Sequence, residues 1–86
     1  MTAVVRVYST AKCPMCQRAK QLLEKWNIPF TIIMVDTDRK GLIEMARLTN
    51  GARTVPQIVI EGQWIGSLSE LTEYHMDGKL DDFIIK

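Results

Sequence analysis

The chain has 86 residues, 47% of them hydrophobic and 24% charged, and its formal net charge is +1. We expect residues 1–86 to form one domain, because domains mostly run to about 100–150 residues. The composition is too apolar and too evenly charged for intrinsic disorder, and the small net charge gives no case for a nucleic-acid or membrane partner. The chain has two cysteines, too few for a disulfide-rich secreted scaffold.

The first residues lack the basic start and apolar stretch of a signal peptide, so we expect a cytoplasmic protein with reduced thiols. Charge is uneven along the chain, at +4 over residues 1–25 and −4 over residues 61–86. Both cysteines lie in the positive segment. The asymmetry reflects either ordinary solvated faces or an electrostatic field at the thiols.

The first half of the chain predicts a strand, a helix and a second strand. Ala3–Tyr8 is apolar and β-branched, which favours a strand. Pro14 opens a helical pattern of apolar residues that runs to Trp26. Phe30–Val35 is almost continuously apolar, which is typical of a strand covered on both faces. These three elements predict a right-handed βαβ unit.

A second helix and a hairpin follow. Asp36–Asp38 supplies capping oxygens for a helix over Gly41–Thr49. Pro56–Glu61 and Gln63–Ile65 read as two strands joined through Gly62.

The last predicted helix begins with a capping box. Ser67 stands at the N-cap and Glu70 three residues later, and the helix should run to about Asp77. Apolar residues at positions 80, 83 and 84 suggest a further amphipathic turn. The order β-α-β-α-β-β-α predicts an α/β, thioredoxin-like fold with a four-stranded mixed sheet flanked by helices.

Cys13 and Cys16 lie where the first strand gives way to the first helix. Pro14 suits the first helical position, which places Cys13 at the N-cap, at the positive end of the helix dipole. Such surroundings, with Lys12 and Arg18 nearby, lower the pKa of a thiol. Cys16 follows on the same helical face and should be more buried. We therefore predict that Cys13 is a nucleophile and Cys16 a resolving thiol.

Three alternatives compete with thiol–disulfide chemistry. A zinc site needs about four ligands, and the only histidine is His75. A structural disulfide over so short a loop would stabilise little. The two cysteines could also be inert core residues.

A second motif, Thr54-Val55-Pro56, precedes the third predicted strand. Pro56 is either an ordinary strand-starting proline or the second residue of a cis peptide bond. In the cis form the main chain of Val55 would face outward, ready to pair with an extended peptide. The residues alone do not decide between these two conformations.

The motifs together resemble the glutaredoxins. The resemblance is carried by Tyr8, Cys13-Pro14-Met15-Cys16, Thr54–Ile60 and Ile65-Gly66-Ser67, and it spans essentially the whole chain. It implies a thioredoxin-like fold, glutathione as reductant and co-substrate, and reversible reduction of disulfides; we expect no metal. It also implies a cis Val55–Pro56 bond whose valine main chain pairs with the cysteinyl part of glutathione.

Matching positions imply the residues that bind glutathione. The set comprises Cys13, Met15, Thr54, Val55, Pro56, Gly66, Ser67, Ser69 and Glu70. The free N–H groups at the start of the last helix suit the γ-glutamyl carboxylate, and Ser69 or Glu70 would hold its ammonium group. We add Lys12 and Arg53 as cations, with Arg53 attracting the glycyl carboxylate.

Four positions depart from the usual glutaredoxin pattern. Met15 replaces Tyr or Phe, Ser67 replaces the second glycine of a Gly-Gly pair, Ser69 replaces a frequent Asp, and Thr10 replaces a common Lys. They bear on glutathione affinity more than on redox chemistry.

We therefore expect an enzyme, a monomeric glutathione-disulfide oxidoreductase whose partners are glutathione and disulfide-bearing proteins, with ribonucleotide reductase one possible client. Two alternatives stay open. One is a dimer that binds an iron–sulfur cluster through Cys13 and glutathione; the other is a carrier reduced by thioredoxin reductase.

Overall fold

A computed structural model describes residues 5–79, and the structural statements below concern these residues. They form four strands and three helices in the predicted order. The elements are β1 (Val5–Ser9), α1 (Pro14–Lys25), β2 (Thr31–Met34), α2 (Arg39–Leu48), β3 (Gln57–Ile60), β4 (Gln63–Gly66) and α3 (Leu68–Met76). Ala3 and Val4 of the first predicted strand, and the predicted turn at positions 80–84, lie outside the described residues.

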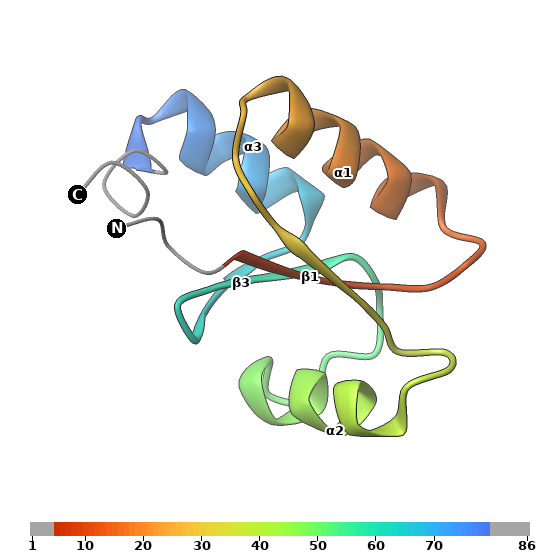
Figure 1. Cartoon of the computed structure of the whole chain (residues 1–86). Helices are drawn as coiled ribbons and strands as arrows, with labels where there is room; N and C mark the ends of the chain where they lie inside the picture. Colours follow the sequence, from red (N-terminus) through yellow and green to blue (C-terminus); the bar gives the residue numbers. More distant parts are fainter. Residues whose placement is uncertain (1–4, 80–86) are drawn as a thin grey trace.

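The strands form one mixed sheet in the order β2-β1-β3-β4. β1 pairs with β2 in parallel and with β3 in antiparallel, and β4 pairs with β3 in antiparallel. Figure 1 shows α1 and α3 on one face of the sheet and α2 on the other. The predicted thioredoxin-like α/β fold is confirmed. Within residues 5–79, no helix has the length and apolar character needed to span a bilayer.

Each face of the sheet carries its own hydrophobic core. The larger core lies under α1 and α3 and consists of Val5, Val7, Ala19, Leu23, Ile28, Ile58, Ile60, Ile65, Leu68 and Leu71. The smaller core lies under α2 and consists of Tyr8, Val35, Met45 and Val59. Alternate residues of β3 belong to the two cores, Ile58 and Ile60 to the larger one and Val59 to the smaller one, because successive side chains of a strand point to opposite faces.

The second strand is less buried than its sequence predicts. Ile32 packs against the larger core and Ile33 against the smaller one, so both faces are contacted as expected. However, β2 is an edge strand, with Thr31 exposed and the next three residues only half-buried. A continuous apolar run indicates that both faces of a strand are covered. It does not indicate whether the strand lies at the edge or in the centre of the sheet.

Local capping chemistry sets the helix starts. The Oδ1 atom of Asp38 accepts a hydrogen bond from the Gly41 N–H at 3.1 Å, which makes Asp38 the N-cap of α2. The helix therefore begins at Arg39, two residues before the predicted start. In the predicted hairpin, Glu61 and Gly62 both have positive φ (51° and 80°), the backbone that a tight two-residue turn requires.

A buried tyrosine connects α2 to the sheet. Tyr8 is fully buried, and its hydroxyl donates a hydrogen bond to Oε1 of Glu44 on α2. Arg6 contacts the same oxygen from β1 at 2.7 Å. Burial, together with the bond to this carboxylate, raises the pKa of Tyr8 to about 12. The Arg6–Tyr8–Glu44 cluster thus fixes α2 against β1, the strand that leads into the cysteine motif.

Candidate active site

Cys13 caps the first helix with its sulfur atom. It is the N-cap of α1, with Pro14 next to it, and its Sγ accepts a hydrogen bond from the backbone N–H of Cys16 at 3.1 Å. This N–H belongs to the first helical turn, where it has no intrahelical partner. The half-buried sulfur therefore faces a backbone donor and the positive end of the helix dipole, as the sequence predicted.

Cys16 occupies a different environment only three residues later. Its side chain is 1% exposed, beneath Cys13 in the first turn of α1. Burial is the main cause that raises the pKa of the Cys16 thiol, and contact with Cys13 adds to it. Hydrogen bonds from Ser9 and the Thr10 backbone act in the opposite direction. The two thiols thus differ in access, and burial disfavours the thiolate form of Cys16.

The Thr54-Val55-Pro56 loop faces this pair of thiols. The Val55–Pro56 peptide bond is cis, as the family resemblance implied. The carbonyl oxygen of Val55 lies 3.8 Å from the Sγ of Cys13, although the two residues are 42 positions apart in the chain. Pro56 is buried, Val55 is half-buried and Thr54 is exposed. The structure therefore brings the two predicted motifs together.

The start of α3 carries the predicted capping box. Oε1 of Glu70 accepts hydrogen bonds from the Ser67 backbone N–H at 2.7 Å and from the Ser67 hydroxyl at 3.0 Å. These two bonds lower the pKa of Glu70. The N–H groups of Leu68 and Ser69, in the first turn, have no intrahelical acceptor by helix geometry. This end of α3 therefore offers two backbone donors beside a fixed carboxylate.

A shallow pocket of about 370 Å³ opens beside this helix start. Trp64, Ile65, Gly66 and Glu70 line it. Gly66 has φ 121°, and a Cβ atom there would lie 2.5 Å from Cγ of Glu70. Only glycine therefore fits between β4 and the capping carboxylate.

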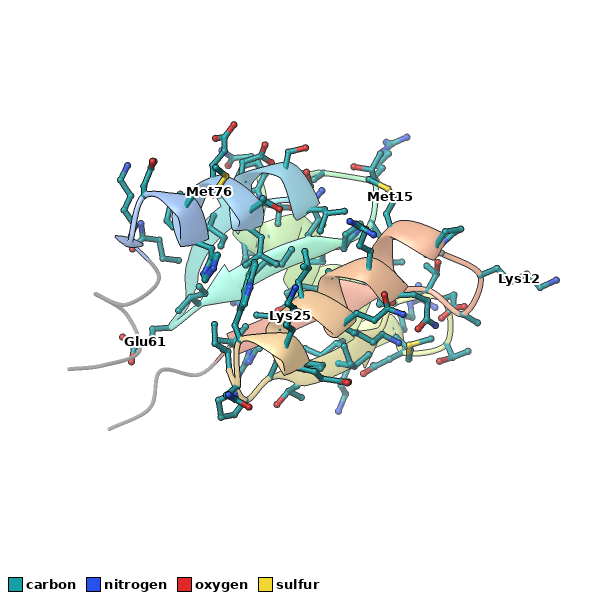
Figure 2. All side chains as sticks on the ribbon, turned by 90° about the horizontal axis from the view of Figure 1, so that it is seen from above. Lys12, Met15, Lys25, Glu61 and Met76 are labelled. Carbon is teal, nitrogen blue, oxygen red and sulfur yellow. The ribbon has the colours of Figure 1, made fainter. Side chains whose placement is uncertain are left out.

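The remaining predicted residues lie on the surface. Lys12, Met15, Arg53 and Ser69 are exposed, and Met15 keeps 51% of its surface accessible. Figure 2 shows Lys12 and Met15 at one end of the molecule and Glu61 at the other, with Lys12 projecting away from the body. Within residues 5–79, no three His, Cys, Asp or Glu side chains come together in a group suited to a metal ion.

Sequence reasoning missed two side chains beside the loop. The indole Nε1–H of Trp64 donates to Oε1 of Gln57 at 2.8 Å. Nε2 of Gln57 in turn donates to the Thr54 carbonyl at 3.0 Å and to the Thr54 hydroxyl oxygen at 3.2 Å. The available signal was a polar Gln57 at the start of an otherwise apolar strand.

Comparison with known proteins identifies the family. The glutaredoxin family model matches residues 5–65. The chain belongs to the glutaredoxin family. It is 42% identical over 77 residues to a Pseudomonas aeruginosa glutaredoxin, covering 90% of each chain. It is 35% identical over 82 residues to glutaredoxin 3 of Escherichia coli, covering 95% of this chain and 98% of that protein.

Solved glutaredoxin structures show the same fold. A crystal structure of a buckwheat glutaredoxin–glutathione complex matches with a TM-score of 0.81 at 33% identity, covering 96% of this chain and 77% of that one. As a glutaredoxin, the protein is a thiol–disulfide oxidoreductase, and the spacing of Cys13 and Cys16 fits a CxxC motif.

Proposed function

We propose that this glutaredoxin uses glutathione to reduce protein disulfides and glutathione mixed disulfides, with Cys13 as the nucleophile and Cys16 as the resolving thiol. The observation that carries the proposal is the position of the Cys13 sulfur. It lies between the Cys16 N–H, at 3.1 Å, and the Val55 carbonyl, at 3.8 Å, and it is the more accessible of the two thiols. A disulfide that approaches Cys13 therefore meets the Val55 main chain at the same time.

A glutathione mixed disulfide requires only Cys13. The Cys13 thiolate attacks the glutathione sulfur, the substrate S–S bond breaks, and the substrate leaves as a thiolate that takes up a proton. The thiolate of a second glutathione then attacks the glutathione sulfur bound to Cys13. This step releases oxidised glutathione and restores the Cys13 thiolate, whose charge the Cys16 N–H faces.

A protein disulfide requires both thiols. Attack by Cys13 produces a mixed disulfide with the client and frees one client thiol. Cys16 then loses its proton and attacks Cys13, which releases the second client thiol and leaves a Cys13–Cys16 disulfide. Two glutathione molecules reduce this bond and become oxidised glutathione. Since burial raises the pKa of Cys16, a smaller fraction of Cys16 is thiolate at neutral pH than of a thiol of ordinary pKa.

We place glutathione across the Val55 loop and the start of α3. The Val55 main chain would pair with its cysteinyl part, in the manner of an added strand. The N–H groups of Leu68 and Ser69 would hold the γ-glutamyl carboxylate. The Glu70 carboxylate would attract the ammonium group from its place in the capping box, assisted by the Ser69 hydroxyl. Met15, Thr54, Pro56 and Gly66 would line the site, with Lys12 and Arg53 near the glycyl carboxylate.

Two cysteine variants and two reducing systems test the proposal. Cys13→Ser should abolish reduction of glutathione mixed disulfides, whereas Cys16→Ser should retain it and lose reduction of protein disulfides. The assay follows NADPH oxidation coupled to glutathione reductase, with thioredoxin reductase as the comparison. Turnover by the Cys13→Ser protein, or faster NADPH oxidation with thioredoxin reductase, would contradict the assignment.

A further inference from the structure

The hydrogen-bonded chain from Trp64 through Gln57 to Thr54 ends at the peptide group beside the cis proline. Gln57 is 4% exposed, so its amide has little access to water and depends on protein partners. The indole N–H of Trp64 is a donor only, and its bond to Oε1 of Gln57 fixes which way the amide points. The Gln57 NH₂ group is then directed at Thr54, where it bonds both the carbonyl and the hydroxyl oxygen.

The carbonyl of Thr54 and the N–H of Val55 belong to one planar peptide group. In a trans peptide these two groups point in opposite directions. When Gln57 draws the Thr54 carbonyl toward β3, the Val55 N–H must point away from β3. The next carbonyl, that of Val55, lies against the Cys13 sulfur at 3.8 Å. The orientation of the Val55 main chain is thus coupled to a side chain on β4.

We propose that Trp64 and Gln57 are positioning residues, which hold the Val55 N–H in the direction needed to pair with the main chain of glutathione or of a client peptide. The inference rests on the proposed function, since it concerns the same site. Neither side chain needs to touch the reacting sulfurs. Trp64 is 39% exposed, so its ring is not required to fill a core, and its distinctive contribution is the indole N–H.

If Trp64 loses its N–H, the Gln57 amide can rotate. In the rotated form Oε1 would face the Thr54 carbonyl, two acceptors would oppose each other, and the Thr54–Val55 peptide would be released. Pairing with Val55 holds a disulfide substrate before and during the transfer. Its loss therefore raises KM and leaves kcat nearly unchanged.

The test compares Trp64→Phe, which keeps an aromatic ring, with Gln57→Met, which keeps the length of the side chain. In the coupled assay with a glutathione mixed disulfide, we expect KM to rise about two- to fivefold for Trp64→Phe and about five- to tenfold for Gln57→Met, since one net hydrogen bond is worth about that much. The double variant should resemble Gln57→Met alone, because both residues act through one peptide group. The rate of Cys13 alkylation by iodoacetamide should not change, because this reagent needs no pairing with Val55.

Trp26→Phe is the matched control. Trp26 caps the opposite end of α1 from Cys13 and stacks on His75 at a ring distance of 3.8 Å. An equal rise in KM in this control, additive effects in the double variant, or an unchanged KM in Trp64→Phe would overturn the proposal. Thermal denaturation of each variant shows whether a change in its activity comes from unfolding.

An NMR measurement keeps this inference separate from the proposed function. The backbone amide resonance of Val55 should shift in Trp64→Phe and stay in place in Trp26→Phe, and neither spectrum requires glutathione. If the wild-type protein fails with glutathione while the Val55 resonance shifts as expected, the choice of reductant is wrong and the positioning role stands. If the resonance does not move, the positioning role is wrong whatever the reductant.

Discussion

Replacing Tyr8 with phenylalanine should remove a pH dependence of stability that the structure assigns to one hydroxyl. The pKa of Tyr8 is raised to about 12 because the side chain is buried and bonded to Glu44, whereas an unfolded tyrosine has its usual pKa of about 10. A folded-state pKa above the unfolded value means that this contribution is fully present below pH 10. It is lost as the pH rises from about 10 to about 12.

The magnitude follows from the two pKa values. A shift of about two units corresponds to roughly 2.7 kcal/mol in the free energy of unfolding, and about half of it, roughly 1.4 kcal/mol, is lost by pH 11. The phenyl ring of the Tyr8→Phe variant cannot ionise, and Glu44 keeps its contact with Arg6 at 2.7 Å. The difference in stability between wild type and Tyr8→Phe should therefore be constant up to about pH 9 and shrink by roughly 1.4 kcal/mol at pH 11.

Urea unfolding of both proteins, from pH 8 to pH 11 under a reducing agent, measures this difference. The other titrating groups are present in both proteins, so their contributions cancel to first order. Two stability curves that stay parallel up to pH 11 would refute the reasoning, because they would mean that Tyr8 ionises equally easily in the folded and unfolded chains.

Two further predictions concern the site itself. Gly66→Ala should destabilise the protein by about 2–3 kcal/mol, from a left-handed backbone and a displaced Glu70 cap, and should raise KM for glutathione substrates. Gly62→Ala is the control, because Gly62 has positive φ but no atom lies within 4 Å of the added Cβ. It should lower the free energy of unfolding only by the backbone strain, about 1–2 kcal/mol. If urea unfolding shows equal losses of stability in the two variants, the Glu70 contact is excluded as a cause. Release of glutathione from glutathionylated Cys13 by Cys16 should accelerate about tenfold per pH unit and keep rising beyond pH 9, because the thiolate attacks and burial raises the pKa of Cys16; a plateau below pH 8 in stopped-flow measurements would contradict this.

The features that sequence reasoning predicted well are those whose cause lies within a few residues. Cys13 caps α1 because Pro14 follows it, and Asp38 caps α2 because its carboxylate reaches the N–H of Gly41. The capping box of Ser67 and Glu70 needs only a spacing of three. In each case the residues that make the contact are neighbours in the chain, so a short sequence pattern is enough to predict the contact.

Contacts between distant residues left no comparable pattern. Arg6 and Glu44 are 38 positions apart, and nothing in the sequence around either residue predicts that the two form an ion pair. The bond between Trp64 and Gln57 crosses the β3–β4 hairpin, where a tryptophan and a glutamine are each unremarkable. The half-burial of β2 depends on the order of strands in the sheet, which hydrophobicity along one segment does not encode. The cis peptide bond before Pro56 was predicted from the family resemblance alone.

This division also separates the chemistry of the site from its selectivity. The donor that faces the Cys13 sulfur comes from Cys16, three residues away, so the proposed nucleophilic chemistry is encoded in one short motif. The surface that we propose a substrate meets comes from Val55, 42 residues from Cys13, and in our proposal its orientation depends on Gln57 of β3 and Trp64 of β4. Changes at Cys13 should therefore affect every disulfide substrate alike. Changes at Gln57 or Trp64 should act on substrates in proportion to how much they use main-chain pairing, least on small reagents and most on glutathione and extended peptides.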